Sequence, residues 1–264
     1  MRLVLRVLDA NRTVRLETSG TDEIVMVFRQ SYAEGDSIEV QVEAPGVRLV
    51  LAIDDALPPI LVFLAGKSFA LPIPFGPERK AYSPKPFSGD MHRLAVRCAR
   101  PQEIGAFRNL ALNPYDHYSN TTLFPQAQAT AQTRGEAVFA PRSAIDGEKA
   151  AAGHGHWPYT SWGINRDPSA ALTLTFGRPV KIDHVTLYLR ADFPHDAWWR
   201  QASLTLSNGA SKVLNLIKSG CGQTFDLRAD NIEWVRLHAM LKADDTSPFP
   251  ALTQLEVWGY DELL

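Results

Sequence analysis

Short apolar runs, separated by turn-forming residues, constrain what this chain can fold into more than any other feature. In the run at 38–42, apolar residues alternate with Glu39 and Gln41. A period of two places one face of a strand in a core and the other in water. Turn residues such as Pro45-Gly46 and Asp54-Asp55 punctuate the runs. In the first half of the chain the runs lie at 3–8, 24–28, 38–42, 47–52, 60–64 and 92–98.

The second half repeats this pattern at the strand density of a β-sandwich. Its runs lie at 171–176, 185–189, 203–206, 213–217, 225–227, 235–241 and 255–258. Helical periodicity is scarce, and a short helix is expected only within 101–112, where Glu103, Ile104, Phe107 and Leu110 are spaced for one helix face. The pattern predicts an all-β protein with two β-sandwich, jelly-roll-like domains.

The chain is long enough for two domains, since its 264 residues exceed the usual domain of about 100–150 residues. A polar stretch with two prolines interrupts the strand pattern at 113–132. We therefore predict an N-terminal β-sandwich at 1–112, a linker at 113–132 and a C-terminal domain at 133–264. The N-terminal domain is a candidate surface for homo-oligomerisation, or a brace for the second domain.

Charge and hydropathy exclude several classes of partner. The net charge is −2, from 27 basic and 29 acidic residues, and no basic block provides the footprint of a nucleic-acid-binding protein. No apolar run approaches the ~18–20 residues of a membrane span. Arg2, Arg6 and Asp9 interrupt the first apolar residues before a signal peptide could form. We expect a soluble, cytoplasmic protein, with export left open for a longer chain. Cys98 and Cys221 lie far apart, and no disulfide is predicted between them.

The stretch Arg190–Arg200, RADFPHDAWWR, is the strongest candidate for a binding loop. It lies between two predicted strands and combines charged and aromatic residues where a connecting loop favours small polar ones. Adjacent Trp198 and Trp199 cannot both enter one core from an extended backbone. We expect four residues to bind ligand: Arg190, Asp192, His195 and Trp199. The alternative is an internal ion pair between Arg190 and Asp192 or Asp196, with Phe193 and Trp198 capping the end of the sandwich.

A second cluster, GHGHWPYTSWG at 153–163, is followed by Asn165. The two histidines lie on one face of an extended segment, a spacing that permits zinc, but no third ligand follows at a recognisable spacing. The tryptophans can also fill a core beneath a long loop. We expect this cluster to complete the ligand site through His154, His156, Trp157, Trp162 and Asn165.

The second half also resembles a known family over residues 130–260. Ser143-Ala-Ile-Asp-Gly-Glu148, Ala171–Val180, Ile182–Val185 and Leu255–Gly259 are similar in order and spacing to motifs of discoidin-like domains. This group includes coagulation-factor C-type domains and family 32 carbohydrate-binding modules. The resemblance implies a galactose-binding-like jelly roll with its ligand in loops at one end. It also implies a structural calcium, with Asp146 at one ligand position and Gln254 where the family usually has a carboxylate.

Aromatic rings cover the apolar faces of sugars, and charged side chains hold their hydroxyl groups. The sequence therefore predicts a non-catalytic carbohydrate-binding protein, with a galactose-type sugar favoured and no catalytic residue assigned. One alternative is a glycoside hydrolase using Asp192 and Asp196, for which two carboxylates ~5–9.5 Å apart are needed. Another is a protein-interaction or assembly module. The common hydrolase, metalloprotease and nucleotide-binding motifs are absent from the sequence.

Overall fold

The computed structural model describes residues 1–191 and 197–262, which form two compact units. Unit 1 comprises Met1–Ile104 and Tyr115–Phe124, and unit 2 comprises Gly105–Pro114 and Pro125–Leu264. The chain therefore passes between the units three times. Within the stretch 113–132, predicted as a linker, residues 115–124 belong to unit 1, while 113–114 and 125–132 belong to unit 2.

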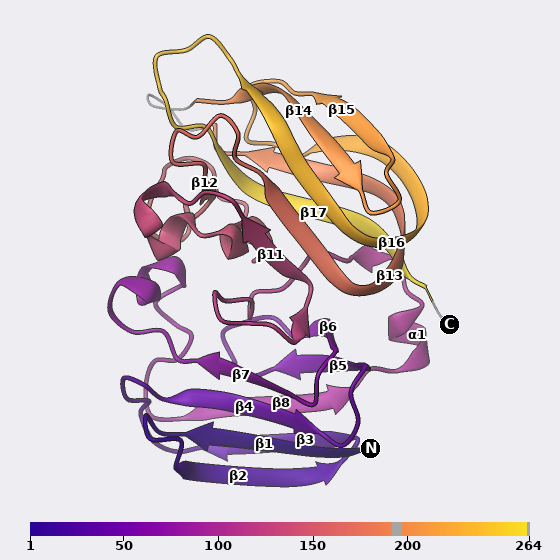
Figure 1. Cartoon of the computed structure of the whole chain (residues 1–264). Helices are drawn as coiled ribbons and strands as arrows, with labels where there is room; N and C mark the ends of the chain where they lie inside the picture. Colours follow the sequence, from indigo (N-terminus) through magenta and orange to yellow (C-terminus); the bar gives the residue numbers. More distant parts are fainter. Residues whose placement is uncertain (192–196, 263–264) are drawn as a thin grey trace. The chain divides into compact units, whose positions relative to one another are not determined.

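Unit 1 is a β-sandwich of two antiparallel sheets (Figure 1). The four-stranded sheet has the order β2 (Val14–Thr21), β1 (Arg2–Leu8), β4 (Ser37–Val42), β7 (Ser68–Pro72). The five-stranded sheet has the order β10 (Leu123–Phe124), β6 (Ile60–Leu64), β5 (Val47–Ala52), β8 (His92–Cys98), β3 (Glu23–Phe28). The segment after β7 contains the 3-10 helix η1 (Gly76–Ala81).

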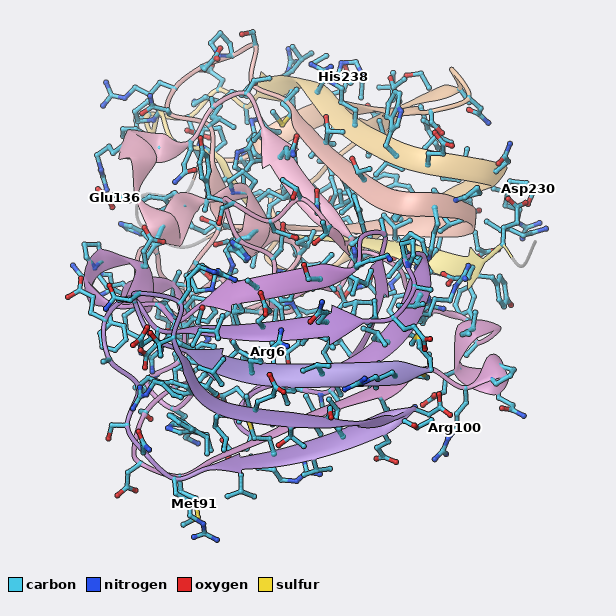
Figure 2. The ribbon with its side chains drawn as sticks, turned by 60° about the horizontal axis from the view of Figure 1, so that its bottom comes forward. Arg6, Met91, Arg100, Glu136, Asp230 and His238 are labelled. Atoms are coloured by element: carbon cyan, nitrogen blue, oxygen red, sulfur yellow. The ribbon has the colours of Figure 1, made fainter. Side chains whose placement is uncertain are left out.

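The alternation seen in the sequence becomes the two faces of these sheets. Leu3, Leu5 and Val7 of β1 are buried. On the opposite face of β1, Arg6 (Figure 2) donates hydrogen bonds to Glu39 and Gln41 of the neighbouring β4. All six strands predicted in this half are present. Three strands described in unit 1 were missed: β2 and β7 are the edges of the four-stranded sheet, and β10 is an edge of the five-stranded sheet. An edge strand is paired on one side only and can be short and polar, so its hydrophobic pattern is weak.

The helix expected within 101–112 is much shorter than that range. Helix α1 covers only Pro101–Ile104, and β9 (Arg108–Asn109) follows in unit 2. The Asn109 side chain accepts hydrogen bonds from the backbone N–H groups of Ala111 and Val257. Pairing with β17 (Ala251–Asp261) thus overrides the weak helical spacing, because it satisfies the backbone groups that a helix would otherwise pair.

Unit 2 is built around two long strands, β13 (Leu172–Leu189) and β16 (Gln223–Lys242). Their pairing register shifts between Thr175 and His184, and the φ angles of Gly177 and Asn231 are positive. Irregularities of this kind bend a strand pair. The two halves of each long strand consequently have different neighbours on either side of the bend.

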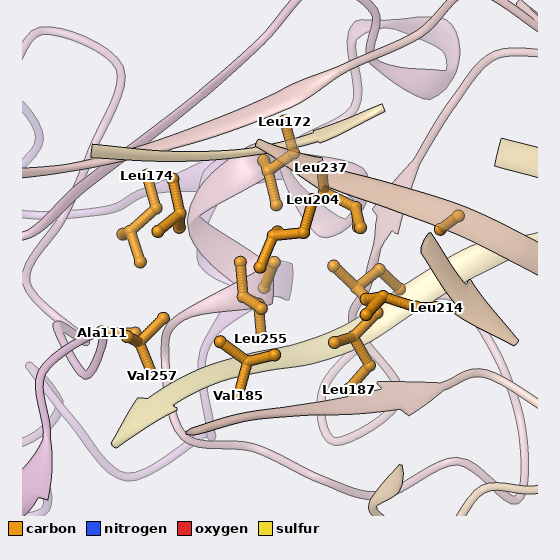
Figure 3. Packing of buried hydrophobic residues seen from close by; sticks show 14 of the residues in the cluster. Ala111, Leu172, Leu174, Val185, Leu187, Leu204, Leu214, Leu237, Leu255 and Val257 are labelled. Carbon is orange, nitrogen blue, oxygen red and sulfur yellow. The ribbon is translucent and has the colours of Figure 1, made fainter. Parts of the chain in front are cut away.

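The neighbours of β13 define the two layers of unit 2. Its first half pairs with β11 (Gln126–Ala129) and with the end of β16. The end of β16 pairs in turn with β14 (Trp199–Leu206), and β14 pairs with β15 (Ser211–Asn215). Its second half pairs with the start of β16 and with β17, which also holds β9 and β12 (Trp162–Gly163). Buried side chains from both layers, including Leu174, Leu204, Val185 and Leu255, form one core (Figure 3). The predicted all-β class with β-sandwich domains is confirmed.

The connections of unit 2 are irregular, and their described parts contain three short 3-10 helices. These are η2 (Thr133–Gly135), η3 (Ala137–Phe139) and η4 (Pro141–Ala144). Among the described residues, no helix has the length and hydropathy that a membrane span requires.

Candidate functional site

A pocket of about 420 Å³ in unit 2 is formed where β13 ends and β17 begins. Its walls come from η2, η3, β12, the connection before β12 and the connection between β16 and β17. Sequence-distant segments meet here because the ends of neighbouring antiparallel strands lie at the same edge of a layer. The lining residues are Thr133, Arg134, Phe139, His154, Gly163, Arg190 and the continuous segment 246–251.

Arg190 links the end of β13 to the 246–250 segment. Its backbone N–H donates to the carbonyl of Ala251, and its Nη2 donates to the carbonyl of Phe249 at 3.0 Å. The residue is 5% exposed. A guanidinium offers five donors in a rigid fork, so one group can both fix the Phe249 backbone and contribute to the pocket wall.

Two arginines cover aromatic rings of the wall. The Arg134 guanidinium carbon lies 5.5 Å from the ring centre of Phe139, and that of Arg166 lies 4.4 Å from the ring centre of Phe249. Arg134 also forms an exposed ion pair with Glu136 (Figure 2). Cation–π contacts orient the rings and hold charged donors at the pocket margin.

Close packing fixes the wall between η2 and β12. A Cβ atom on Gly163 would come within 2.4 Å of the Thr133 hydroxyl oxygen, so only glycine fits at this position. That hydroxyl accepts a hydrogen bond from the backbone N–H of Asn165 at 3.0 Å. The Asn165 side chain in turn accepts one from the backbone N–H of Arg134 at 3.3 Å. Asn165 thus supports the pocket wall without lining it.

The structure brings two of the predicted ligand residues, Arg190 and His154, to this pocket. His156 and Trp157 are exposed and lie outside its lining, as does Asn165. Asp192 and His195, together with Asp196, lie outside the described residues. The 153–163 cluster and the start of the 190–200 stretch therefore converge through His154 and Arg190.

Trp162 and Trp199 do not have the ligand-contacting positions expected of them. They are 0% and 1% exposed, and their rings contact each other in the core with centres 6.4 Å apart. Trp162 Nε1 donates to the carbonyl of Ala131 at 2.9 Å. Rings buried in this way offer no surface to a sugar. The core-filling alternative therefore holds for Trp162 but not for Trp157, which is 37% exposed, and Trp199 fills the core where ligand contact was expected.

Several pocket residues were not singled out from the sequence. Phe139, Thr133 and Arg134 lie in a stretch that has neither strand periodicity nor a dense cluster of charged and aromatic side chains. Phe249 lies in the segment 242–250. The only sequence feature that pointed to a binding role for this segment was its position just before the last predicted strand. Those four residues become neighbours only because η2, η3 and the segment before β17 line the same pocket.

A separate polar cluster surrounds Asp146 and Gln254, the expected calcium ligands. Gln254 Nε2 lies 2.8 Å from Asp146 Oδ1, 2.7 Å from the carbonyl oxygen of Ser143 and 2.8 Å from that of Thr253. Gln254 Oε1 accepts from the backbone N–H of Gly147 at 3.1 Å. Burial raises the pKa of Asp146 to about 7, against the lowering effect of nearby Arg142. Within the described residues, no three His, Cys, Asp or Glu side chains are grouped to hold a metal.

Comparison with known proteins gives structural likeness only. No family model matches the chain, and no curated protein matches it. A fucose-binding module from Streptococcus pneumoniae is 17% identical, with a TM-score of 0.42, and the match covers 58% of this chain and 99% of that one. The family 32 module of C. perfringens NanJ, solved with galactose, is 17% identical, with a TM-score of 0.39, and 50% and 92% are covered.

A chitosan-binding module from Paenibacillus sp. IK-5 is 19% identical, with a TM-score of 0.39 and coverage of 58% and 99%. These are carbohydrate-binding modules, the class of domain that the motifs of the second half resemble. The description of unit 2 as a β-sandwich rests on its own strand pairing.

Proposed function

We propose that the pocket lined by Arg190, His154 and Phe249 binds a carbohydrate, and that it does so without catalysing a reaction. The observation that carries the proposal is the combination of aromatic rings with buried and exposed nitrogen donors around one concave site. Its volume of about 420 Å³ lies within the ~300–1,000 Å³ typical of small-molecule sites.

The chemistry of the wall suits a sugar. Phe139 and Phe249 supply apolar surface for C–H groups, while Arg134, Arg190 and His154 supply donors for hydroxyl oxygens. Thr133 and Ser247 add hydroxyl groups that can donate or accept. Such a wall recognises a ligand that presents apolar and hydroxyl-bearing faces together.

A galactose-type sugar is the first ligand class to test, as the resemblance of the second half to discoidin-like domains implies. The similar solved structures are described as binding fucose, galactose and chitosan. The pocket of this chain, rather than the specificity of those proteins, is the basis of the proposal.

The test is a glycan array with the purified full chain, followed by calorimetric titration of any sugar that binds. His154→Ala and Phe249→Ala are each expected to weaken binding about tenfold or more, which corresponds to ~1.4 kcal/mol. Tyr260→Ala is the matched control, because Tyr260 is an exposed aromatic residue of unit 2 outside the pocket lining.

Far-UV circular dichroism establishes that each variant is folded. Loss of affinity in both pocket variants, with the control unchanged, supports the proposal. Binding that persists at full affinity in both variants contradicts this location of the site. Absence of binding to every glycan by the folded protein contradicts carbohydrate binding itself.

A further inference from the structure

The amide group of Gln254 occupies the centre of an oxygen-lined site in unit 2. Three oxygen atoms lie within 2.8 Å of its Nε2: Asp146 Oδ1 and the carbonyl oxygens of Ser143 and Thr253. Gln254 is 1% exposed, and Ser143 and Thr253 are fully buried. A carboxylate and two carbonyl groups converging on one point form the kind of donor set that a hard cation prefers.

The orientation of this amide is determined by its partners. Oε1 faces the backbone N–H of Gly147, which can only donate, and Nε2 faces oxygens that accept. Exchanging the two atoms would place an oxygen against three oxygens and a donor against a donor. The positive end of the amide dipole therefore points at Asp146.

We propose that the Gln254 carboxamide takes the place of a structural cation, and that unit 2 joins the 143–148 turn to β17 without calcium. The turn is tied to β17 through both ends of one side chain, since Ser143, Asp146 and Gly147 all bond to Gln254. Asp146 is held further by the N–H of Glu148, which donates to Oδ1 at 2.9 Å.

The residues do not fit calcium as they stand. Calcium takes 6–8 oxygen ligands at 2.3–2.6 Å, and here a nitrogen that carries hydrogens lies at the point where the oxygens meet. Buried Arg142 acts on Asp146 as a further positive charge. A divalent cation could enter only by displacing the Gln254 amide and breaking its bonds to Ser143, Asp146 and Gly147.

The first experiment measures the thermal unfolding of the full chain with calcium and with EDTA. The melting temperature, Tm, is expected to be the same in both, because a cation that does not bind the folded state cannot stabilise it. A Tm that rises with calcium and falls with EDTA overturns the proposal.

Two substitutions test the position of the amide. Gln254→Glu replaces the NH₂ group by an oxygen beside Asp146, so its Tm in EDTA is expected to fall and calcium is expected to raise it by about 4 °C or more. Gln223→Glu is the matched control. The Gln223 amide also bonds at both ends, to the backbone N–H and carbonyl of Ile217, and its variant is expected to show no calcium response.

A folded Gln254→Glu protein without a calcium response contradicts the assigned position. If that variant does not fold, equilibrium dialysis of the unmodified chain against calcium still decides the matter. One calcium bound per chain overturns the proposal, and none bound supports it.

Discussion

At the scale of single residues, the adjacent Trp198 and Trp199 side chains lie in different environments. Neighbouring side chains of a strand point to opposite faces, and Trp199 is buried in the core while Trp198 is only partly buried. Alternation along a strand does not by itself determine which of the two rings faces the core. Trp199 contacts Trp162, a residue 37 positions earlier in the chain, and no local pattern reveals such a contact.

Trp199→Ala is expected to lower the free energy of unfolding by about 3–5 kcal/mol, the usual cost of truncating a large buried aromatic residue. Urea unfolding followed by circular dichroism measures this change. Trp157→Ala is the control, since Trp157 is 37% exposed, and a change below about 1 kcal/mol is expected there. Equal effects of the two substitutions would contradict the burial assigned to Trp199.

At the scale of elements, the long strands show what a hydrophobic pattern can and cannot resolve. The pattern predicted separate strands at 171–176 and 185–189, with Gly177 and Pro179 as a break. The structure joins them as β13, and Gly177 lies at the bend with a φ of 70°. A residue that interrupts alternation signals a change in direction, but only pairing with β16 determines whether the strand continues beyond it.

Glu103 of the short helix α1 makes the stability of the protein depend on pH. Glu103 accepts from Arg97 Nη1 at 2.7 Å and from the backbone N–H of Arg100 at 2.8 Å. The hydrogen bond from Arg97, followed by that from Arg100, lowers the pKa of Glu103 to about 2. Because the folded state has the lower pKa, the stabilisation is present above the unfolded pKa of about 4.5 and is lost as the pH falls towards 2.

Glu103→Gln is accordingly expected to reduce stability at neutral pH by less than about 1 kcal/mol, since the pair is partly exposed. Its difference from the unmodified chain is expected to shrink as the pH falls below about 4. Urea unfolding at several pH values measures both quantities. A difference that stays constant with pH would show that the carboxylate charge is not responsible.

At the scale of the whole molecule, the two units are not simple consecutive halves of the sequence. Unit 2 includes Gly105–Pro114, which supplies β9 and buried Leu110 and Ala111. Arg108 of this segment also pairs with the buried carboxylate of Asp261 at 2.7 Å. The C-terminal unit therefore begins earlier in the chain than the predicted domain 133–264.

Two fragments test this division. A fragment 105–264 retains β9, β11 and the Arg108–Asp261 pair and is expected to fold with a cooperative thermal transition. A fragment 133–264 loses them and keeps the pair between Arg178 and Asp261. The fragment also loses Leu110 and Ala111 from the core of unit 2. It is therefore expected to melt at a lower temperature or to remain unfolded. Equal melting temperatures would contradict the assignment of 105–114 to unit 2.

The sequence alone determined the fold class and most of the strands, because alternation and turn residues are local properties that burial imposes on each strand separately. Local motifs also predicted a ligand-binding role for Arg190 and His154 and placed Asp146 and Gln254 at one expected metal site. Only the tertiary structure decided that Trp162 and Trp199 fill the core, that Phe139 and Phe249 line a pocket with Arg190, and that Gln254 directs its nitrogen at Asp146. These outcomes depend on contacts between residues far apart in the chain, whose geometry is determined by strand pairing and packing rather than by neighbouring residues.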